Sequence, residues 1–580
     1  MSQRMTNWLL FLVAAIAIGY SGFWWVQGNL AKKNVEASLA RLNANAAQYG
    51  QKEPFIAYDG IELSGYPMNT TLSLTNPRTT LPASALIQSI NALPVKDSLG
   101  DALKQDRHMA TWVEKMEYKA PIVISAALFR NRYSIEVPGY RSHTIIDGKE
   151  MFSMDASMAS PLRCDAAFAG TAIGLTNRAI SKDTTSQEWV ALFRSFDCSL
   201  KQGMQVIDAS TKAPVVAMAE NTVYFEASEP RGEERDYHLI INAPKTEYGK
   251  GYDVYMTMLD FHTDFRMYGL VPVFYSASGP MSVHADIEMT GPADFSKKDN
   301  TLNTFKLNIK AMDMKNNLME ASNRWQIDNL NSPASGKRTV MIKIDSKFRY
   351  LPEWDVQLKE NAPAGMQRLM TYPEPGLQVA LKTALDGMTE AERADLLQKV
   401  VPTFSRFGTW RYAIDANADI TPGAGGSPMA GQQSVQVKEF AAGCDLYGIA
   451  AAGSVQNPPP ATRLNVQLRA FDRLIDEAVA YARGIRPLLE KVMPVATVYI
   501  DNQPLIDGVK TFVTAISQAD AAQPTIRTMS VESAGGMPPT ISGKSMAELM
   551  QLAQEHVLSK LTPAQPAPAD SPVRPKKKPQ

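Results

Sequence analysis

The stretch ELSGYPMNTTLSL, residues Glu62–Leu74, joins a turn signal to a strand in which apolar and polar residues alternate. Gly allows a positive φ and Pro fixes the backbone, so Gly65–Pro67 predicts a tight turn between two strands. After the turn, Met68, Leu72 and Leu74 fall on one face and polar residues fall on the other. One dry face and one wet face are typical of an antiparallel sheet.

The same period of two recurs along the chain, at residues 305–311, 340–344, 410–416 and 464–468. Helical spacing is found instead at residues 377–400, 471–482 and 505–516. Two capping boxes predict helix starts, one at Thr389 with Glu392 and one at Ser545 with Glu548. We therefore predict an α+β, β-rich fold: an N-terminal transmembrane helix followed by large antiparallel sheets, with helices covering parts of them.

No residue from Trp8 to Val26, a stretch of 19 residues, is charged. At about 1.5 Å per residue, a helix of this length is close to the roughly 30 Å of a bilayer's hydrocarbon core. We predict a transmembrane anchor over residues 8–27, with a secretory signal cut after Ala17 as the alternative. Aromatic rings that favour the lipid–water interface lie at both ends of the stretch: Trp8, Phe23, Trp24 and Trp25.

The anchor divides the chain into parts. We expect residues 1–7 to form a cytoplasmic tail and residues 28–50 a stalk helix. The positive charges on the two sides of the anchor are nearly balanced, but a short N-terminal tail usually stays in the cytoplasm, so the body is expected outside it.

The body itself is expected to divide near a Gly- and Pro-rich stretch. The predicted parts are a β-rich extracytoplasmic domain over residues 51–420, in one piece or as two subdomains, a linker or long loop over 421–434, an α+β C-terminal domain over 435–562, and a disordered Pro/Lys-rich tail over 563–580.

Composition gives little indication of chemistry. With 59 basic and 59 acidic residues, the chain lacks the net charge that favours nucleic acid as a partner. The six histidines show no metal-binding spacing. ISGKS at residues 541–545 resembles the end of a phosphate-binding loop, but Pro538 stands where that loop needs Gly. We predict no catalytic, cofactor-binding or metal-binding residues and no enzyme activity.

The chain contains three cysteines, Cys164, Cys198 and Cys444, and none of them is in a CxxC pair. Cys164 and Cys198 are near enough in sequence to form a disulfide in an oxidising compartment. Three unrelated buried thiols are the alternative, and the spacing does not decide between the two.

Taken together, the apolar run, the SGYP turn at residues 64–67 and the LSLTNP strand at 72–77 carry a resemblance. They resemble an alphaproteobacterial domain-of-unknown-function family of single-anchor periplasmic proteins, in which an aromatic is common where Met68 stands. More distantly, the chain is similar to AsmA-like and YdgA-like envelope proteins. The resemblance implies a single-pass protein of the bacterial inner membrane with its bulk in the periplasm. It also implies long β-sheets that present an apolar groove, and it implies no catalytic residues.

Three functions follow as hypotheses. The first is a non-enzymatic envelope protein that binds lipid in an apolar sheet groove, with Met68, Leu72 and Leu74 on the lipid-facing strand. The second is a membrane-anchored scaffold with a closed core that binds other envelope proteins. The third is an unrecognised enzyme. The partners expected are the bilayer, through the N-terminal helix, and lipid or envelope proteins, with no cofactor and no nucleic acid.

Overall fold

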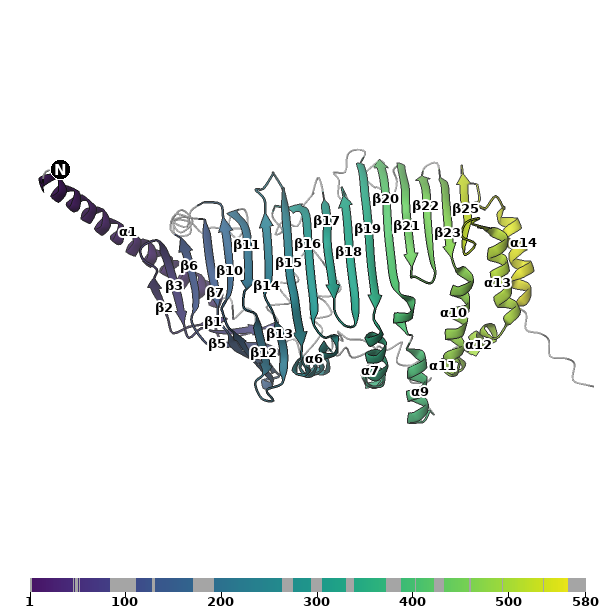
Figure 1. Cartoon of the computed structure of the whole chain (residues 1–580), viewed down its shortest axis with the longest axis horizontal. Coiled ribbons are helices and arrows are strands. Elements are labelled where there is room, and N and C mark those ends of the chain that lie inside the picture. Colours follow the sequence, from purple (N-terminus) through teal and green to yellow (C-terminus); the bar gives the residue numbers. More distant parts are fainter. Residues whose placement is uncertain are drawn as a thin grey trace, which may run out of the picture. The chain divides into compact units, whose positions relative to one another are not determined.

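The structure is a computed structural model of the chain (Figure 1). Its described residues form two compact units. The first unit is drawn from residues 1–372 and 403–431, and the second from residues 373–402 and 432–580. The boundary at residue 431 lies inside the stretch predicted as a linker or long loop. The described residues are 3–44, 46, 51, 53–83, 111–127, 131–170, 192–262, 275–293, 305–329, 338–371, 388–401, 403–421, 432–457, 460–492, 494–535 and 537–561. The predicted tail over 563–580 and most of the predicted linker lie outside them.

The first unit is built mainly from antiparallel strands. Its helices are α1 (Gln3–Ala44), α6 (Lys250–His262) and α7 (Pro352–Thr371), with short 3₁₀ helices η2 (Tyr275–Ser278) and η3 (Phe404–Phe407). Its strands are β1 (Ile56–Ala57), β2 (Gly60–Ser64), β3 (Asn69–Thr75), β4 (Arg78–Pro82), β5 (Val113–Tyr118), β6 (Ile122–Ala127), β7 (Arg132–Val137), β8 (Tyr140–Ile146), β9 (Lys149–Met158), β10 (Leu162–Phe168), β11 (Phe193–Leu200), β12 (Met204–Asp208), β13 (Pro214–Met218), β14 (Asn221–Ala227), β15 (Glu234–Tyr248), β16 (Met281–Pro292), β17 (Lys306–Lys315), β18 (Met319–Asp328), β19 (Arg338–Tyr350) and β20 (Thr409–Thr421).

The strands from β1 to β14 are halves of longer strands that are interrupted near the middle. One set of halves pairs in the order β2-β3-β6-β7-β10-β11-β14, which we call the first half-sheet. The other set pairs in the order β1-β4-β5-β8-β9-β12-β13, the second half-sheet. Both half-sheets end on the same strand, because β14 and β13 pair with successive parts of β15.

Proline marks the line where the strands are interrupted. Pro77, Pro121, Pro138 and Pro161 lie in the short connections between the two halves of their strands. Pro244 lies in β15 where the register shifts and the partner changes from β14 to β13. Because proline has no N–H to donate and a fixed φ, it ends ladder pairing at each of these points. We call this line of interruptions the crease.

Beyond β15 the sheet continues as a simple meander. Each strand from β15 to β20 pairs antiparallel with the next strand along the chain. The strands predicted at residues 305–311, 340–344 and 410–416 lie in β17, β19 and β20. The prediction of a β-rich, antiparallel α+β fold is confirmed.

The N-terminal segment is one continuous helix, α1, which spans part of the predicted tail, the predicted anchor and most of the predicted stalk helix. It ends at Ala44, inside the predicted stalk of residues 28–50. Among the residues that the structure describes, no helix combines the length and apolarity needed to cross a membrane. The transmembrane helix expected over residues 8–27 stays a prediction.

Two helices cover parts of the creased sheet. Ala31, Val35 and Leu39 of α1 pack against buried side chains of the first half-sheet, among them Leu72 and Leu74. On the second half-sheet, α6 packs Tyr252, Tyr255 and Met258 over a core formed by Phe152, Ala156, Val206 and Val215. Each half-sheet thus has its own covering helix.

The second unit is a smaller antiparallel sheet with helices. Its strands are β21 (Gln432–Gly443), β22 (Gly448–Asn457), β23 (Ala461–Arg469), β24 (Gln518–Ala519), β25 (Ile526–Ala534) and β26 (Thr540–Ile541). Strands β21, β22, β23 and β25 pair in that order. Its helices are α9 (Glu390–Val400), α10 (Phe471–Gly484), α11 (Arg486–Val492), α12 (Pro494–Ile500), α13 (Gln503–Ile516), α14 (Met546–His556) and the 3₁₀ helix η5 (Leu558–Lys560).

The helix predictions that fall on described residues are confirmed in this unit. Helices α10 and α13 coincide with the apolar stripes at 471–482 and 505–516. Thr389 and Glu392 exchange the hydrogen bonds of a capping box at the start of α9. Ser545 and Glu548 do the same at the start of α14. Residues 377–387 lie outside the described residues.

A glycine in α13 lies close against the end of α14. A Cβ on Gly508 of α13 would lie 1.8 Å from the main-chain oxygen of His556, whereas a Cβ on Gly484 of α10 would meet nothing within 4 Å. We expect Gly508→Ala to lower the thermal unfolding midpoint, at a cost of about 1 to 3 kcal/mol, because the helices must separate.

The matched control is Gly484→Ala, which we expect to be neutral or to stabilise by up to about 1 kcal/mol because alanine favours helix. Thermal unfolding followed by circular dichroism measures both. Equal effects of the two substitutions would contradict the close packing of α13 on α14.

Candidate functional site

The register of β14 to β20 gathers apolar side chains into rows that cross the sheet. One row runs without a break through seven successive strands and is called the apolar row below: Phe225, Leu239, Ile287, Ile309, Trp325, Ile344 and Ile414. Residues that pair directly across neighbouring strands project from the same face of a sheet. The apolar row therefore defines one apolar face over β14–β20.

A second row lies beside the first on this face. Tyr237, Met289, Leu307, Ile327, Ile342 and Ala416 are paired from β15 to β20. On β16–β20, Ile309 is the one buried member of the two rows, and every other member there is only half-buried. A packed core would remove such side chains from water almost completely. This face consequently keeps apolar surface in contact with solvent.

Aromatic side chains close one end of the face. Phe348 stacks on Trp410, with ring centroids 6.0 Å apart, and Trp410 also contacts Phe407 of η3. Tyr350 packs against Trp354 of α7 at 4.9 Å. The Asp355 carboxylate accepts hydrogen bonds from the backbone N–H groups of residues 404 and 405, which fixes η3 against α7. The apolar row lies outside this cluster.

The opposite face of the same strands is polar and charged. Arg324 of β18 forms an ion pair with Asp313 of β17 at 2.7 Å, and Arg411 of β20 forms one with Asp345 of β19 at 2.9 Å. The Arg324 guanidinium lowers the pKa of the Asp313 carboxyl by donating hydrogen bonds to it. The two faces thus differ in character along the whole length of the row.

A hollow of about 570 Å³ lies on this polar face over β14–β18. Its lining includes Asp236, His238, Glu288 and Lys306. Asp236 accepts a hydrogen bond from Thr290 at 2.7 Å, and the hydrogen bond from Lys310 lowers the pKa of Glu288. These two carboxylates are therefore paired within the protein, and the apolar face is the stronger candidate site.

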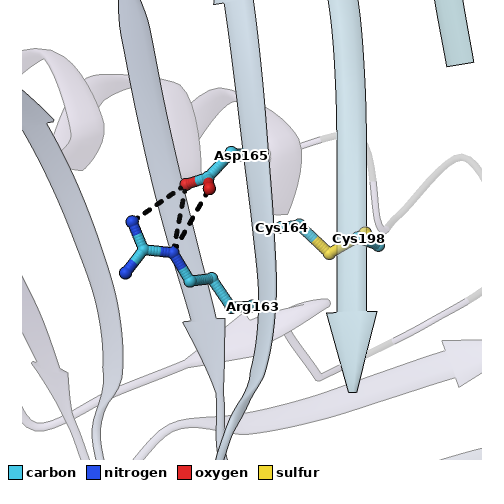
Figure 2. The surroundings of a disulfide bond; sticks show 4 residues. All are labelled: Arg163, Cys164, Asp165 and Cys198. Carbon is cyan, nitrogen blue, oxygen red and sulfur yellow. Dashed lines mark hydrogen bonds and ion pairs between the residues drawn. A yellow bond between two sulfur atoms is a disulfide. The ribbon is translucent and has the colours of Figure 1, made fainter. Parts of the chain in front are cut away.

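The predicted disulfide partners lie within the continuation of the apolar face. Cys164 of β10 and Cys198 of β11 are directly paired, with Cα atoms 4.0 Å apart, and their sulfur atoms are bonded. Figure 2 shows this bond on the side of β10 away from Arg163 and Asp165, which pair with each other at 3.2 Å. Pairing across the strands continues this line to Ile135 and Val223. The third cysteine, Cys444, is a buried free thiol in the second unit.

The residues predicted on the lipid-facing strand lie in two environments. Leu72 and Leu74 are each 3% exposed, because α1 covers them together with Ile61. The prediction that Leu72 and Leu74 face lipid is therefore wrong, because both side chains contact a helix. Met68, in the turn before β3, is 65% exposed.

The residues predicted at the membrane interface also differ from one another. Trp24 is turned towards the sheet, where its indole N–H donates to the main-chain oxygen of Asn69 at 2.7 Å. Phe23 and Trp25 are exposed. The side chain of Trp8 lies outside the described residues.

A half-buried carboxyl lies under α6. Glu114 of β5 accepts a hydrogen bond of 2.8 Å from Thr144 of β8, and Thr144 is almost fully buried. Loss of water around Glu114 raises the pKa of its carboxyl, although the hydrogen bond from Thr144 opposes the shift. Burial likewise raises the pKa of Tyr255 on α6, with a contribution from the charge of Glu114. Ionised Glu114 is therefore unfavourable in the folded chain.

Chemistry-bearing residues do not otherwise converge in the described part of the chain. No group of three or more His, Cys, Asp or Glu side chains that could hold a metal ion occurs among the described residues.

No protein-family model, curated protein or solved structure matches this chain. What the molecule shows is a β-rich antiparallel protein with one long apolar sheet face. That face was missed as a unit from sequence, because only the register reveals which alternating residues share a row.

The raised pKa of Glu114 predicts a pH-dependent stability. When the folded-state pKa of a carboxyl is raised, its contribution to the stability of the fold is fully present at a pH below the ordinary pKa of 4.5. This contribution is lost as the pH rises through the raised pKa. We expect Glu114→Gln to be more stable than the native chain at pH 8, with the difference shrinking as the pH falls towards 4.5. Thermal unfolding midpoints across this range measure the difference.

Glu117→Gln is the control, because it removes the same charge from an exposed position of the same strand. A constant difference between Glu114→Gln and the native chain across the pH range would contradict the prediction.

Proposed function

We propose that this protein is a non-enzymatic, membrane-attached protein of the bacterial envelope that binds lipid on the apolar face of its sheet. The observation that carries the proposal is the apolar row, in which seven strands place apolar side chains side by side while leaving most of them only half-buried. Large exposed apolar surfaces on soluble domains mark binding sites.

The size of the face fits an acyl chain. Neighbouring strands are about 4.8 Å apart, so the six intervals from β14 to β20 span roughly 29 Å. A leaflet of a bilayer is about half of a roughly 30 Å hydrocarbon core, so its chains extend about 15 Å. One or two acyl chains lying across the strands would cover the row. Met289 in the second row adds a flexible, polarizable contact that adapts to different chains.

The scaffold alternative has support from other parts of the sheet. Helix α1 covers the first half-sheet at Leu72 and Leu74, and α6 covers the second half-sheet at Phe152 and Val206. These regions have closed cores and leave no apolar face for a lipid. The half-buried row on β15–β20 favours lipid binding over a fully closed scaffold.

The attachment and location proposed here rest on sequence and on the disulfide. The uncharged stretch from Trp8 to Val26 supports attachment to a membrane. The Cys164–Cys198 bond supports an oxidising compartment, which in bacteria is the periplasm. The resemblance to single-anchor periplasmic proteins agrees with both. We therefore propose a protein of the inner membrane with its bulk in the periplasm.

Two substitutions on adjacent residues of β19 test the lipid site. Ile344 is in the apolar row, and the exposed Lys343 projects from the polar face. We expect Ile344→Asn to weaken binding of a fluorescently labelled phosphatidylethanolamine about tenfold, since losing about 1.4 kcal/mol of apolar contact has that effect. Lys343→Asn is expected to leave binding unchanged. Titration of the labelled lipid into purified protein, followed by fluorescence, measures both.

Mass spectrometry of the gently purified native chain gives an independent readout of co-purified phospholipid. Absence of phospholipid, together with equal affinities of the two variants, would overturn the lipid site and leave the scaffold.

A reporter fusion tests the location. Alkaline phosphatase fused after Gln580 is expected to be active in cells, because this reporter folds only where disulfides form. A fluorescent reporter that matures in the cytoplasm should be dark at the same position. The reverse pattern would place the body of the protein in the cytoplasm.

A further inference from the structure

We propose that the turn between β2 and β3 enters the lipid–water interface together with α1, so that helix and turn form one membrane-seated unit. This inference rests on the membrane attachment proposed above and extends it to the turn. The proposed surface consists of Ile18, Phe23, Trp25 and Val26 on α1 and Tyr66 and Met68 in the turn, and we call it the collar.

Hydrogen bonds fix the turn against the helix. The Tyr20 hydroxyl donates to the main-chain oxygen of Pro67 at 2.5 Å, and the hydroxyls of Ser21 and Tyr66 are 2.7 Å apart. The Trp24 indole N–H donates to the main-chain oxygen of Asn69, and the Trp24 ring meets Tyr66 edge-on with centroids 5.4 Å apart. The turn therefore contacts α1 at the level of residues 20–24.

The collar surrounds the helix at this level. Trp25 is 61% exposed and Ile18 is 74% exposed. Because a helix rotates by roughly 100° per residue, both side chains point about a third of a turn away from the sheet-facing Trp24. The turn occupies the sheet-facing side and adds the exposed side chains of Tyr66 and Met68. Residues 18–26 cover about 12 Å along the helix axis. Within this length, apolar or aromatic side chains are thus exposed both on the helix and on the turn.

The polar side chains that dock the turn on α1 have partners inside the protein. Ser21 Oγ donates to the main-chain oxygen of Ala17 at 2.7 Å, and it is the acceptor available to the Tyr66 hydroxyl. With the bonds of Tyr20 and Trp24, the side-chain donors of the docked turn are satisfied. A buried polar group without a partner is costly in lipid, and these bonds remove that cost.

The neighbouring sequence favours a bilayer over a protein as the occupant. The apolar stretch from Trp8 to Val26 ends within the collar. Lys32 and Lys33 follow about two helical turns later, where ammonium groups can reach anionic headgroups. Tyrosine and tryptophan favour this boundary because each has an apolar ring and a polar edge.

Site-specific labelling of the full chain tests the collar. Met68→Cys is labelled with nitrobenzoxadiazole, whose emission shifts to the blue and strengthens in lipid. The native cysteines do not compete for the label, because Cys444 is buried and Cys164 and Cys198 are bonded to each other. The labelled chain is reconstituted in vesicles of phosphatidylethanolamine and phosphatidylglycerol. We expect a blue shift and a several-fold loss of quenching by aqueous iodide, relative to the same protein without vesicles.

The matched control is Met537→Cys, since Met537 is 69% exposed, close to the 65% of Met68, and lies in the second unit. Its label is expected to stay fully accessible to iodide. If the chain floats with the vesicles while the Met68 label stays as accessible as the Met537 label, the collar is wrong but membrane attachment stands. If the chain does not float with the vesicles, attachment fails and the collar fails with it. Neither result depends on lipid binding at Ile344, which the titration above measures separately.

Discussion

Cross-strand register is the constraint on which the rest of the structure depends. A strand places successive side chains on opposite faces, so a slip of one residue in any pair would turn a strand's apolar residues towards the polar side. From β14 to β20 the pairs keep Leu239, Ile309 and Ile344 in one row while Arg324 and Asp345 stay on the other face. Ion pairs on the polar face and apolar contacts on the other favour the same register.

Covering elements decide which parts of the face are available. Helix α1 closes the beginning of the first half-sheet, and the contacts among α7, η3 and Trp410 close one end of β19 and β20. Between them, most members of the apolar row are only half-buried. A single sheet thus combines packed regions, which supply stability, with a region whose apolar surface is open to a ligand.

Features that depend on residues close together along the chain, such as strands and helix starts, were predicted correctly from the sequence. The alternation in β3, β17 and β20 identified strands, and the pair Ser545 and Glu548 identified the start of α14, because these signals are local. Helices α6 and α7 were missed. The start of α6 is rich in aromatic residues, which form helix less readily than alanine or leucine, and α6 packs against the second half-sheet.

The candidate site depended on information that the sequence does not contain. Alternation places Leu72 on the dry side of β3 but does not reveal that α1 lies over it. It also gives no indication that Trp24 would donate its N–H to the β3 backbone and so face the sheet. Which dry residues remain exposed is a property of tertiary covering, and the half-buried row was visible only once strand partners were known.

The meander has a consequence for how such a chain can change in size. Each strand from β15 to β20 pairs with its immediate neighbours in sequence, so contacts are local and the ladder is assembled one hairpin at a time. Insertion or loss of one hairpin would lengthen or shorten the row by about 10 Å without altering the pairs on either side. Evolution could therefore match the length of this surface to the proposed ligand by copying or deleting two strands, much as repeat proteins change length by whole units.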